Sequence, residues 1–400
     1  MGRPDQRPQR ISLAGELTGL VLPGERERVV IRWPGAAVRG YREPVLAPPA
    51  DLPEAALMAA LERSWGITAA SIGYRPLGWG SHHWEVAGQD GSRWFVTADE
   101  LETKRWAASD TPAAAFARLR AALATARELR DCGRSFVVAP VPAGDGEPLA
   151  RLGARFAVAV YPFIEGRSFG WGEFSSPEHR SSVLHMLVAV HTAPAAAARH
   201  GLADDFTLQC RAELESACAP GGETTDPGNA GPETTDPGNA GPENAGGEAA
   251  GGPYARPVAA LIRQHAAPLL DLLARYDSLV ALARSRPGRA VLTHGEPHPG
   301  NTMLTGDGWL LIDWDTVLLA PPERDLWSLD PGDGRILAAY AAATGITPRP
   351  SLLDLYRLRW DLTDIALEVS RFQRPHAGDA NDDKAWQELT SLVSRVSEAG

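Results

Sequence analysis

The order of apolar and polar positions divides the chain into a strand-rich first part and a helical second part. A helix is predicted to open at Asp51, a residue type that suits an N-cap. Residues 70–101 then alternate apolar and polar positions, which predicts two or three strands joined by glycine-containing turns. Residues 111–133 predict one helix, and residues 135–166 predict two further strands. Three strands, a helix and two strands are typical of a small α+β unit.

Beyond this unit the pattern becomes mainly helical. Residues 178–194 are apolar on nearly all sides, so they predict a buried central helix. The unit ETTDPGNAGP occurs at 223–232 and again at 233–242, and a segment so rich in proline and glycine cannot form a packed core. We therefore expect four parts, namely a poorly ordered leader, a strand-rich lobe, a helical lobe and a disordered insertion within it: residues 1–50, 51–162, 163–400 and 220–252.

The charge balance narrows the class of partner. The chain has 39 basic and 50 acidic residues, so its net charge of −11 argues against nucleic-acid or anionic-membrane partners and suits a cationic small molecule. No apolar run approaches the ~18 residues that would span a bilayer. The three cysteines lack metal-ligand spacing, which favours reduced thiols and a cytoplasmic protein. Only Lys104 and Lys384 are lysines, so any mechanism that needs a lysine has two candidates.

The stretch "THGEPHPGN", followed by "LLIDWD", carries the candidate chemistry. It predicts a strand, a loop with His294, Glu296 and Asn301, and a second strand that ends at Asp313. A carboxylate that deprotonates a hydroxyl group, with an amide and a carboxylate for Mg²⁺, is what phosphoryl transfer requires. A metal-dependent hydrolase built on the same acids is an alternative. A helical zinc site through His294 and His298 is disfavoured, because prolines and glycines interrupt any helix between them.

These residues resemble the motifs of the aminoglycoside phosphotransferase family, which has a protein-kinase-like fold. The resemblance covers about residues 52–375: "HGEPHPGN" matches the catalytic loop, "IDWD" the metal segment and "VAVYPFIEG" the hinge between lobes. It implies a bilobal α+β fold with a strand-rich N-lobe and a helical C-lobe. It also implies ATP between the lobes, Mg²⁺, and O-phosphorylation of a hydroxylated, cationic small molecule such as an aminoglycoside or an amino alcohol.

The resemblance also implies roles for single residues. Glu296 takes the position of the catalytic base, and Asn301 and Asp313 take the positions of the Mg²⁺ ligands. The expected supports of the loop and metal site are His294, Asp315 and Asp325. The expected nucleotide-binding residues lie in the glycine turn and at the hinge: Gly78, Trp79, Gly80, Ser81, Tyr161 and Phe163, with the backbone of residues 160–163 facing the adenine.

Two positions depart from the family pattern. The base is normally aspartate, and the extra methylene of Glu296 moves its carboxylate by ~1.5 Å, where a misplacement of ~1 Å can cost ~10²-fold in rate. The third strand usually carries a lysine, but Thr97 stands there. Lys104 either folds back over the phosphates, with Glu128 as its salt-bridge partner, or is a plain surface charge. These departures leave open a catalytically weak, nucleotide-binding pseudokinase with a scaffold or sensor role.

One predicted helix is a candidate for acceptor binding. At 100° per residue, three carboxylates of "LYRLRWDLTDIALEVSRF" share one face beside an apolar stripe: Asp361, Asp364 and Glu368. They would suit a cationic substrate. The alternative is an ordinary salt-bridged surface in which Arg357 pairs with Asp361 at i, i+4.

Overall fold

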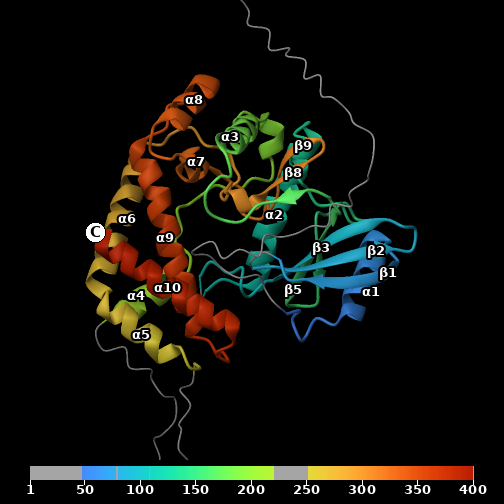
Figure 1. Cartoon of the computed structure of the whole chain (residues 1–400), viewed down its shortest axis with the longest axis horizontal. Coiled ribbons are helices and arrows are strands. Elements are labelled where there is room, and N and C mark those ends of the chain that lie inside the picture. Colours follow the sequence, from blue (N-terminus) through green and yellow to red (C-terminus); the bar gives the residue numbers. More distant parts are fainter. Residues whose placement is uncertain (1–46, 78–79, 108, 220–250, 400) are drawn as a thin grey trace, which may run out of the picture.

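The computed structural model describes residues 47–77, 80–107, 109–219 and 251–399 (Figure 1). Most of the expected leader, most of the expected insertion, and Gly78 and Trp79 of the expected glycine turn lie outside the described residues. No helix in the described ranges is long and apolar enough to cross a membrane.

The first part of the chain forms a five-stranded antiparallel sheet with the order β1-β2-β3-β5-β4. Its strands are β1 (Ala69–Arg75), β2 (His82–Gly88), β3 (Arg93–Glu100), β4 (Ala150–Leu152) and β5 (Phe156–Pro162). Side chains alternate between the two faces of a strand, and Val96 and Ala98 of β3 are buried in one cluster with Leu57 and Leu61 of α1 (Glu54–Trp65). Thr97 and Asp99 therefore face the opposite side of the sheet. The predicted order of strands and helix is observed.

The predicted N-cap of the first helix is wrong. Pro53 occupies the N-cap position of α1, and its side chain makes no capping hydrogen bond. Asp51 instead forms an ion pair with Arg155, which follows β4. Proline is tolerated at a helix start because its missing N–H is one of the groups that no helical carbonyl would accept.

Helix α2 (Pro112–Asp131) connects the sheet to the rest of the molecule. The hydroxyl group of Thr111 caps it by accepting a hydrogen bond from Ala114 N at 3.1 Å. The first half of α2 packs against the sheet, where Leu119 and Leu123 meet Ala157 and Ala159 of β5. The second half packs against the helical part in a different cluster, shared by Ala126 and Leu129 of α2 with Val183 and Leu187 of α3 (Pro177–His191). One helix thus belongs to two hydrophobic cores.

The second part of the chain is mainly helical (Figure 1). Helix α3 packs one side into the core through Val183, Leu187 and their neighbours, but the prediction that it is buried on nearly all sides is wrong, because Glu178 and His185 are exposed. Helix α9 contacts α4, α6, α7 and α10 and so organises the helical core. The remaining helices are α4 (Arg211–Cys218), α5 (Ala255–Gln264), α6 (Ala266–Ser285), α7 (Glu323–Leu329), α8 (Arg335–Thr344), α9 (Pro350–Phe372) and α10 (Ala380–Ala399), with 3-10 turns at η1 (Ala195–Ala198) and η2 (Pro299–Asn301).

Two small sheets carry the loop that holds the candidate chemistry. Strand β7 (Val291–Thr293) pairs with β10 (Leu318–Ala320), and β8 (Thr302–Thr305) lies between β6 (Arg167–Ser168) and β9 (Gly308–Leu311). The predicted strand, loop and second strand are therefore observed, but the predicted end of the second strand at Asp313 is wrong, because β9 ends at Leu311 and Asp313 has a positive φ. Ile312 N donates to Asn301 O at 2.9 Å, which brings the end of the loop beside the residues that follow β9.

Candidate functional site

Asp325, on α7, holds the start of the loop. Its carboxylate accepts hydrogen bonds from the backbone N–H groups of His294 at 2.8 Å and Gly295 at 2.6 Å, and it contacts His191 Nε2 at 3.0 Å. Burial alone would raise the pKa of Asp325, but the hydrogen bond from His191 and the positive charge of Arg324, with the other nearby groups, together outweigh burial and lower it. A buried carboxylate that accepts several N–H groups fixes a backbone conformation firmly. This is the kind of contact expected of a loop support.

His294 braces the same loop from within. Its Nε2 lies 2.9 Å from Ile312 O, and its Nδ1 accepts the backbone N–H of Glu296 at 3.2 Å. Burial lowers the pKa of His294. A neutral ring with its proton on Nε2 satisfies both contacts, so His294 links the loop to the end of the second strand and does not act as a base.

Gly295 occupies a position that requires glycine. Its φ is +101°, in the region that L side chains rarely adopt, and an added Cβ would lie 2.5 Å from Arg324 Nη2. Arg324 is itself fixed, because it donates to Thr293 Oγ1 and to Thr316 O at 2.8 Å each. The backbone immediately before Glu296 is therefore tightly determined.

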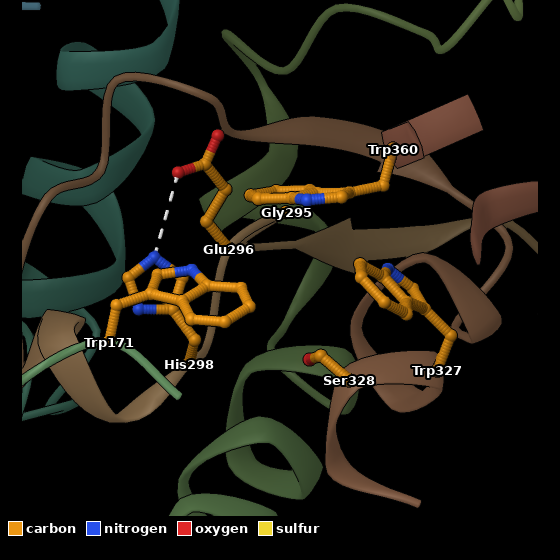
Figure 2. Close-up of a pocket in the computed structure, with 7 residues that line it drawn as sticks. All are labelled: Trp171, Gly295, Glu296, His298, Trp327, Ser328 and Trp360. Atoms are coloured by element: carbon orange, nitrogen blue, oxygen red, sulfur yellow. Dashed lines mark ion pairs between the residues drawn. The ribbon is translucent and has the colours of Figure 1, made fainter. Parts of the chain in front are cut away.

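Glu296 projects from this loop into a cavity (Figure 2). Its side chain is 35% exposed, so a hydroxyl group from solvent can reach the carboxylate. His298 Nε2 lies 3.9 Å from Glu296 Oε2, but burial lowers the pKa of His298 to about 3, so this ring is neutral at neutral pH and the contact is no salt bridge. Asn301 Nδ2 donates to Glu296 O at 3.0 Å, which leaves the amide oxygen of Asn301 as the atom that could hold a metal ion.

Asp313 and Asp315 follow β9 and complete an acidic cluster with Glu296. Burial raises the pKa of Asp313 well above its ordinary value, and the nearby carboxylates of Asp315 and Glu296 raise it further. Asp313 also has a φ of +65°, an uncommon conformation for a residue with a side chain, of the kind found at functional sites. Excess negative charge next to an amide oxygen fits a hard divalent cation such as Mg²⁺. Asn301 and Asp313 can therefore hold the ion that the sequence implies.

Lys104 reaches into this cluster from the other lobe. Its Nζ lies 2.7 Å from Asp315 Oδ2 and 3.0 Å from Asp99 Oδ1. Burial opposes the charge on Lys104, but the two carboxylates outweigh it and raise its pKa well above the ordinary value. The predicted partner of Lys104 is wrong, because Glu128 pairs with Arg199. Of the two readings of Lys104, a plain surface charge is excluded by these contacts.

The other residues expected to bind the nucleotide differ in their surroundings. Gly80 has a φ of +83° and lies beside Lys104, and Ser81 Oγ donates to Asp99 Oδ1 at 2.5 Å. Burial and then the charge of Asp99 raise the pKa of Tyr161 well above its ordinary value, which places this side chain near the acidic cluster. Phe163 lies under the guanidinium group of Arg93, 3.8 Å from ring centroid to Cζ.

The hinge backbone is partly occupied by contacts within the protein. Val160 O accepts a hydrogen bond from Val141 N at 2.7 Å, and Phe163 N donates to Arg93 O at 3.2 Å. Both groups belong to the backbone segment that was expected to face the adenine, and both already form hydrogen bonds within the protein. The N–H of Phe163 is therefore not available to a nucleotide in this conformation.

The cavity beside Glu296 is lined mainly by aromatic side chains. Figure 2 shows Trp171 and His298 on one side of it and Trp327 and Trp360 on the other. Gly295, Glu296 and Ser328 complete its lining. The rings of Trp327 and Trp360 lie 5.6 Å apart between centroids. Among the described residues, His298 Nδ1 and Trp360 Nε1 are buried and have no hydrogen-bond partner.

The three carboxylates of α9 do not line this cavity. Asp361 pairs with Arg395 of α10 at 3.2 Å, and Glu368 is buried and lies 3.9 Å from Arg371. The surroundings of Asp361 and Glu368 thus fit the alternative of a salt-bridged face. The predicted partner of Asp361 is wrong, because Arg357 pairs with Asp354. The structure brings Trp360 of the same helix to Glu296, and not the acidic residues.

Sequence reasoning missed Asp99 and the tryptophans. The signal for Asp99 was present, since strand alternation puts it on the same face as Thr97, where the family carries its lysine. No signal joined Trp171, Trp327 and Trp360, which come from three distant segments and meet only through the packing of the helical lobe.

The chain matches a phosphotransferase family model in sequence and solved phosphotransferases in fold. The model of the phosphotransferase enzyme family matches residues 86–361. Protein StrN of Streptomyces griseus is 31% identical over 271 residues, which are 66% of this chain and 74% of that protein.

Two solved structures share the fold at low sequence identity. A spectinomycin phosphotransferase in complex with ADP and spectinomycin has a TM-score of 0.57 and 16% identity, over 85% of this chain and 97% of that one. An amicoumacin kinase in complex with AMP-PNP, Ca²⁺ and Ami has a TM-score of 0.51 and 11% identity, over 87% of this chain and 94% of that one. The bilobal, protein-kinase-like fold expected from the sequence is thereby confirmed.

Proposed function

The chain belongs to the phosphotransferase enzyme family, and we propose that it transfers the γ-phosphoryl group of ATP to a hydroxyl group of a cationic small molecule in the cytoplasm. One observation carries the proposal. Glu296, Asn301 and Asp313 converge on one acidic cluster, and Lys104 enters that cluster from the other lobe, where it lies beside Gly80. A scaffold that only bound nucleotide would not need a carboxylate facing an acceptor cavity.

Each residue has a separate task in the proposed transfer. Glu296 orients the acceptor hydroxyl group and takes its proton as the new O–P bond forms and the bond between the β-phosphate oxygen and the γ-phosphorus breaks. ADP leaves with the electron pair of that bond. Asn301 and Asp313 would hold Mg²⁺, which supplies charge neutralisation at the phosphates. Asp325 and His294 keep the loop in register for this geometry.

The cavity supports a cationic acceptor through its aromatic walls. An ammonium group over a tryptophan face is attracted by ~0.5–2 kcal/mol, and the carboxylate of Glu296 adds favourable charge at the cavity wall. Asn301 Nδ2 contacts His298 Nε2 at 3.4 Å, so the neutral ring carries its proton on Nδ1, and the unpaired His298 Nδ1 and Trp360 Nε1 offer two donors to polar groups of the substrate. We propose neither nucleic acid nor membrane as partner.

Turnover with matched alcohols tests the proposal. The purified protein would be incubated with Mg·ATP and a panel that includes 1-amino-2-propanol, spectinomycin, choline and the neutral choline analogue 3,3-dimethylbutan-1-ol, and ADP release would be measured. We expect turnover with at least one cationic alcohol. Glu296→Gln should lower kcat by about 10²–10⁴-fold, which is the usual contribution of a general base, and should leave ATP affinity unchanged. Binding of Mg·ATP without turnover on any alcohol, with no effect of Glu296→Gln, contradicts the proposal.

A further inference from the structure

We propose that Lys104 binds the nucleotide phosphates in place of a lysine on β3, and that Asp99 is the positioning residue that holds it there. The inference rests on the proposed function, because it concerns the nucleotide side of the same site. It assigns the phosphate-binding cation to a loop outside the sheet, and it gives a role to a buried aspartate that the reaction scheme above does not use.

Strand β3 carries no lysine, and its one arginine, Arg93, is paired with Glu85 and Glu165. Thr97 of β3 lies opposite His83 of β2 and Ala159 of β5 in the sheet. Burial lowers the pKa of His83 to about 4, so its ring is neutral at neutral pH. Lys384, the other lysine of the chain, belongs to α10, where it lies 3.9 Å from Glu388. Lys104 is therefore the lysine available to the phosphates.

The loop after β3 carries Lys104 back into the cleft. Arg118 of α2 donates to Lys104 O at 3.2 Å, which fixes the backbone of the loop against that helix. The Nζ atom then lies 3.9 Å from where a Cβ on Gly80 would be, and 3.5 Å from Ser81 Oγ. The ammonium group thus lies between the turn that would cover the phosphates and the acids that would hold Mg²⁺.

Asp99 has the properties of an anchor for this ammonium group. It is only 4% exposed, and its Oδ1 contacts both Lys104 Nζ at 3.0 Å and Ser81 Oγ at 2.5 Å. A buried carboxylate is tolerated when it is paired and hydrogen-bonded, as Asp99 is. In protein kinases a helical glutamate holds the strand lysine. Here Glu128 of α2 is engaged with Arg199, and Asp99 takes over that task from the strand.

The second contact of Lys104, to Asp315, is the one that a nucleotide would exchange. An ammonium group has three N–H donors, and they point to Asp99, Ser81 and Asp315 in the nucleotide-free protein. Phosphate oxygens entering below the glycine turn would take the donor that now meets Asp315. Asp99 would keep its own donor throughout, so the ammonium group stays in place when the nucleotide arrives.

Nucleotide affinity by calorimetry tests the pair independently of turnover. Lys104→Ala should weaken ADP binding by about 10–100-fold, as expected for loss of a charge-assisted hydrogen bond, and should leave adenosine binding unchanged because adenosine has no phosphate. Lys384→Ala is the matched control and should change neither. Asp99→Asn should weaken ADP binding in the wild-type background and have no further effect once Lys104 is alanine.

A transplanted lysine provides the sharper test. Thr97→Lys in the Lys104→Ala background puts a lysine at the family's strand position, two residues from Asp99 on the same face, and should restore ADP affinity to within a few-fold of wild type. The inference is overturned if Lys104→Ala binds ADP like wild type, or if it weakens adenosine binding as much as ADP binding. It is also overturned if Asp99→Asn weakens ADP binding as much in the Lys104→Ala background as in the wild type. If ADP binds as expected and no alcohol is ever phosphorylated, the proposed function fails while the Lys104 and Asp99 assignment stands.

Discussion

Glu296 is longer than aspartate by one methylene group, and its backbone is held on both sides. Its N–H donates to His294 Nδ1 at 3.2 Å, and its carbonyl oxygen accepts from Asn301 Nδ2 at 3.0 Å. The loop therefore has little freedom to move the carboxylate, so the side-chain length itself sets where the base lies. Glu296 is one of the residues that line the cavity, which indicates a site shaped around glutamate.

Shortening the side chain should therefore impair the enzyme. Glu296→Asp withdraws the carboxylate by ~1.5 Å, and a displacement on that scale costs about 10²-fold in rate. We expect kcat to fall by roughly that factor with an unchanged affinity for ATP, measured by steady-state kinetics on the best acceptor from the panel. A gain in kcat would mean that the loop still suits aspartate.

At the level of elements, α9 shows what a helical pattern can and cannot reveal. Its periodicity correctly grouped Asp361, Asp364 and Glu368 on one side, but periodicity does not say which neighbour covers that side. Helix α10 supplies Arg395 to Asp361, and Arg371 of α9 reaches Asp382 of α10 at 2.9 Å. The acidic side of α9 thus contacts α10, while Trp360 of the same helix lines the cavity.

Trp360 is therefore the residue of α9 whose loss should affect the acceptor. Trp360→Leu removes one aromatic wall and an indole N–H, so the KM for a cationic acceptor should rise by about 5–30-fold, on the scale of one cation–π contact, with little change for ATP. Trp386→Leu on α10, where the ring packs near Tyr254, is the matched control and should change stability but not KM. An equal rise of KM for choline and for its neutral analogue would show that charge plays no part in the binding.

Local patterns predicted more of this protein than long-range ones could. The loop and the second strand carry Glu296, Asn301 and Asp313 within eighteen residues, so their spacing alone located the acidic cluster. The contact of Lys104 with Asp315 joins residues 211 positions apart, and only the packing of the two lobes creates it. The same holds for the tryptophan cavity, whose walls come from segments that no local spacing relates.

At the scale of the whole molecule, a buried ion pair fixes the segment after η1 to α9. Arg359 Nη1 lies 2.8 Å from both carboxylate oxygens of Asp204, and Tyr356 OH donates to the same group at 3.0 Å. The side chain of Asp204 is fully buried, which would raise its pKa, but Arg359 and Arg324 outweigh burial and lower it. The pair therefore stabilises the fold wherever Asp204 is ionised.

The depressed pKa sets the pH range of this contribution. It is fully present above the unfolded-state pKa of about 3.9, and it is lost as the pH falls through the lower folded-state value. Asp204→Asn should lower the free energy of unfolding by about 3–5 kcal/mol at pH 7, because Arg359 is left buried without a counter-charge. In this variant the free energy of unfolding should also fall less steeply below pH ~4. Urea denaturation from pH 3 to pH 7 measures both effects, with the exposed neighbour variant Asp205→Asn as control. Equal stabilities of the two variants at pH 7 would contradict this account.

Helix α2 has a consequence for how the protein comes apart. Its first half lies in the core under the sheet, and its second half lies in the core around α3. Melting either core would strip apolar surface from the same helix and so weaken the other. The expected boundary near residue 162 would therefore separate two lobes that differ in structure but unfold as one cooperative unit. Heat should unfold both lobes together in one calorimetric transition.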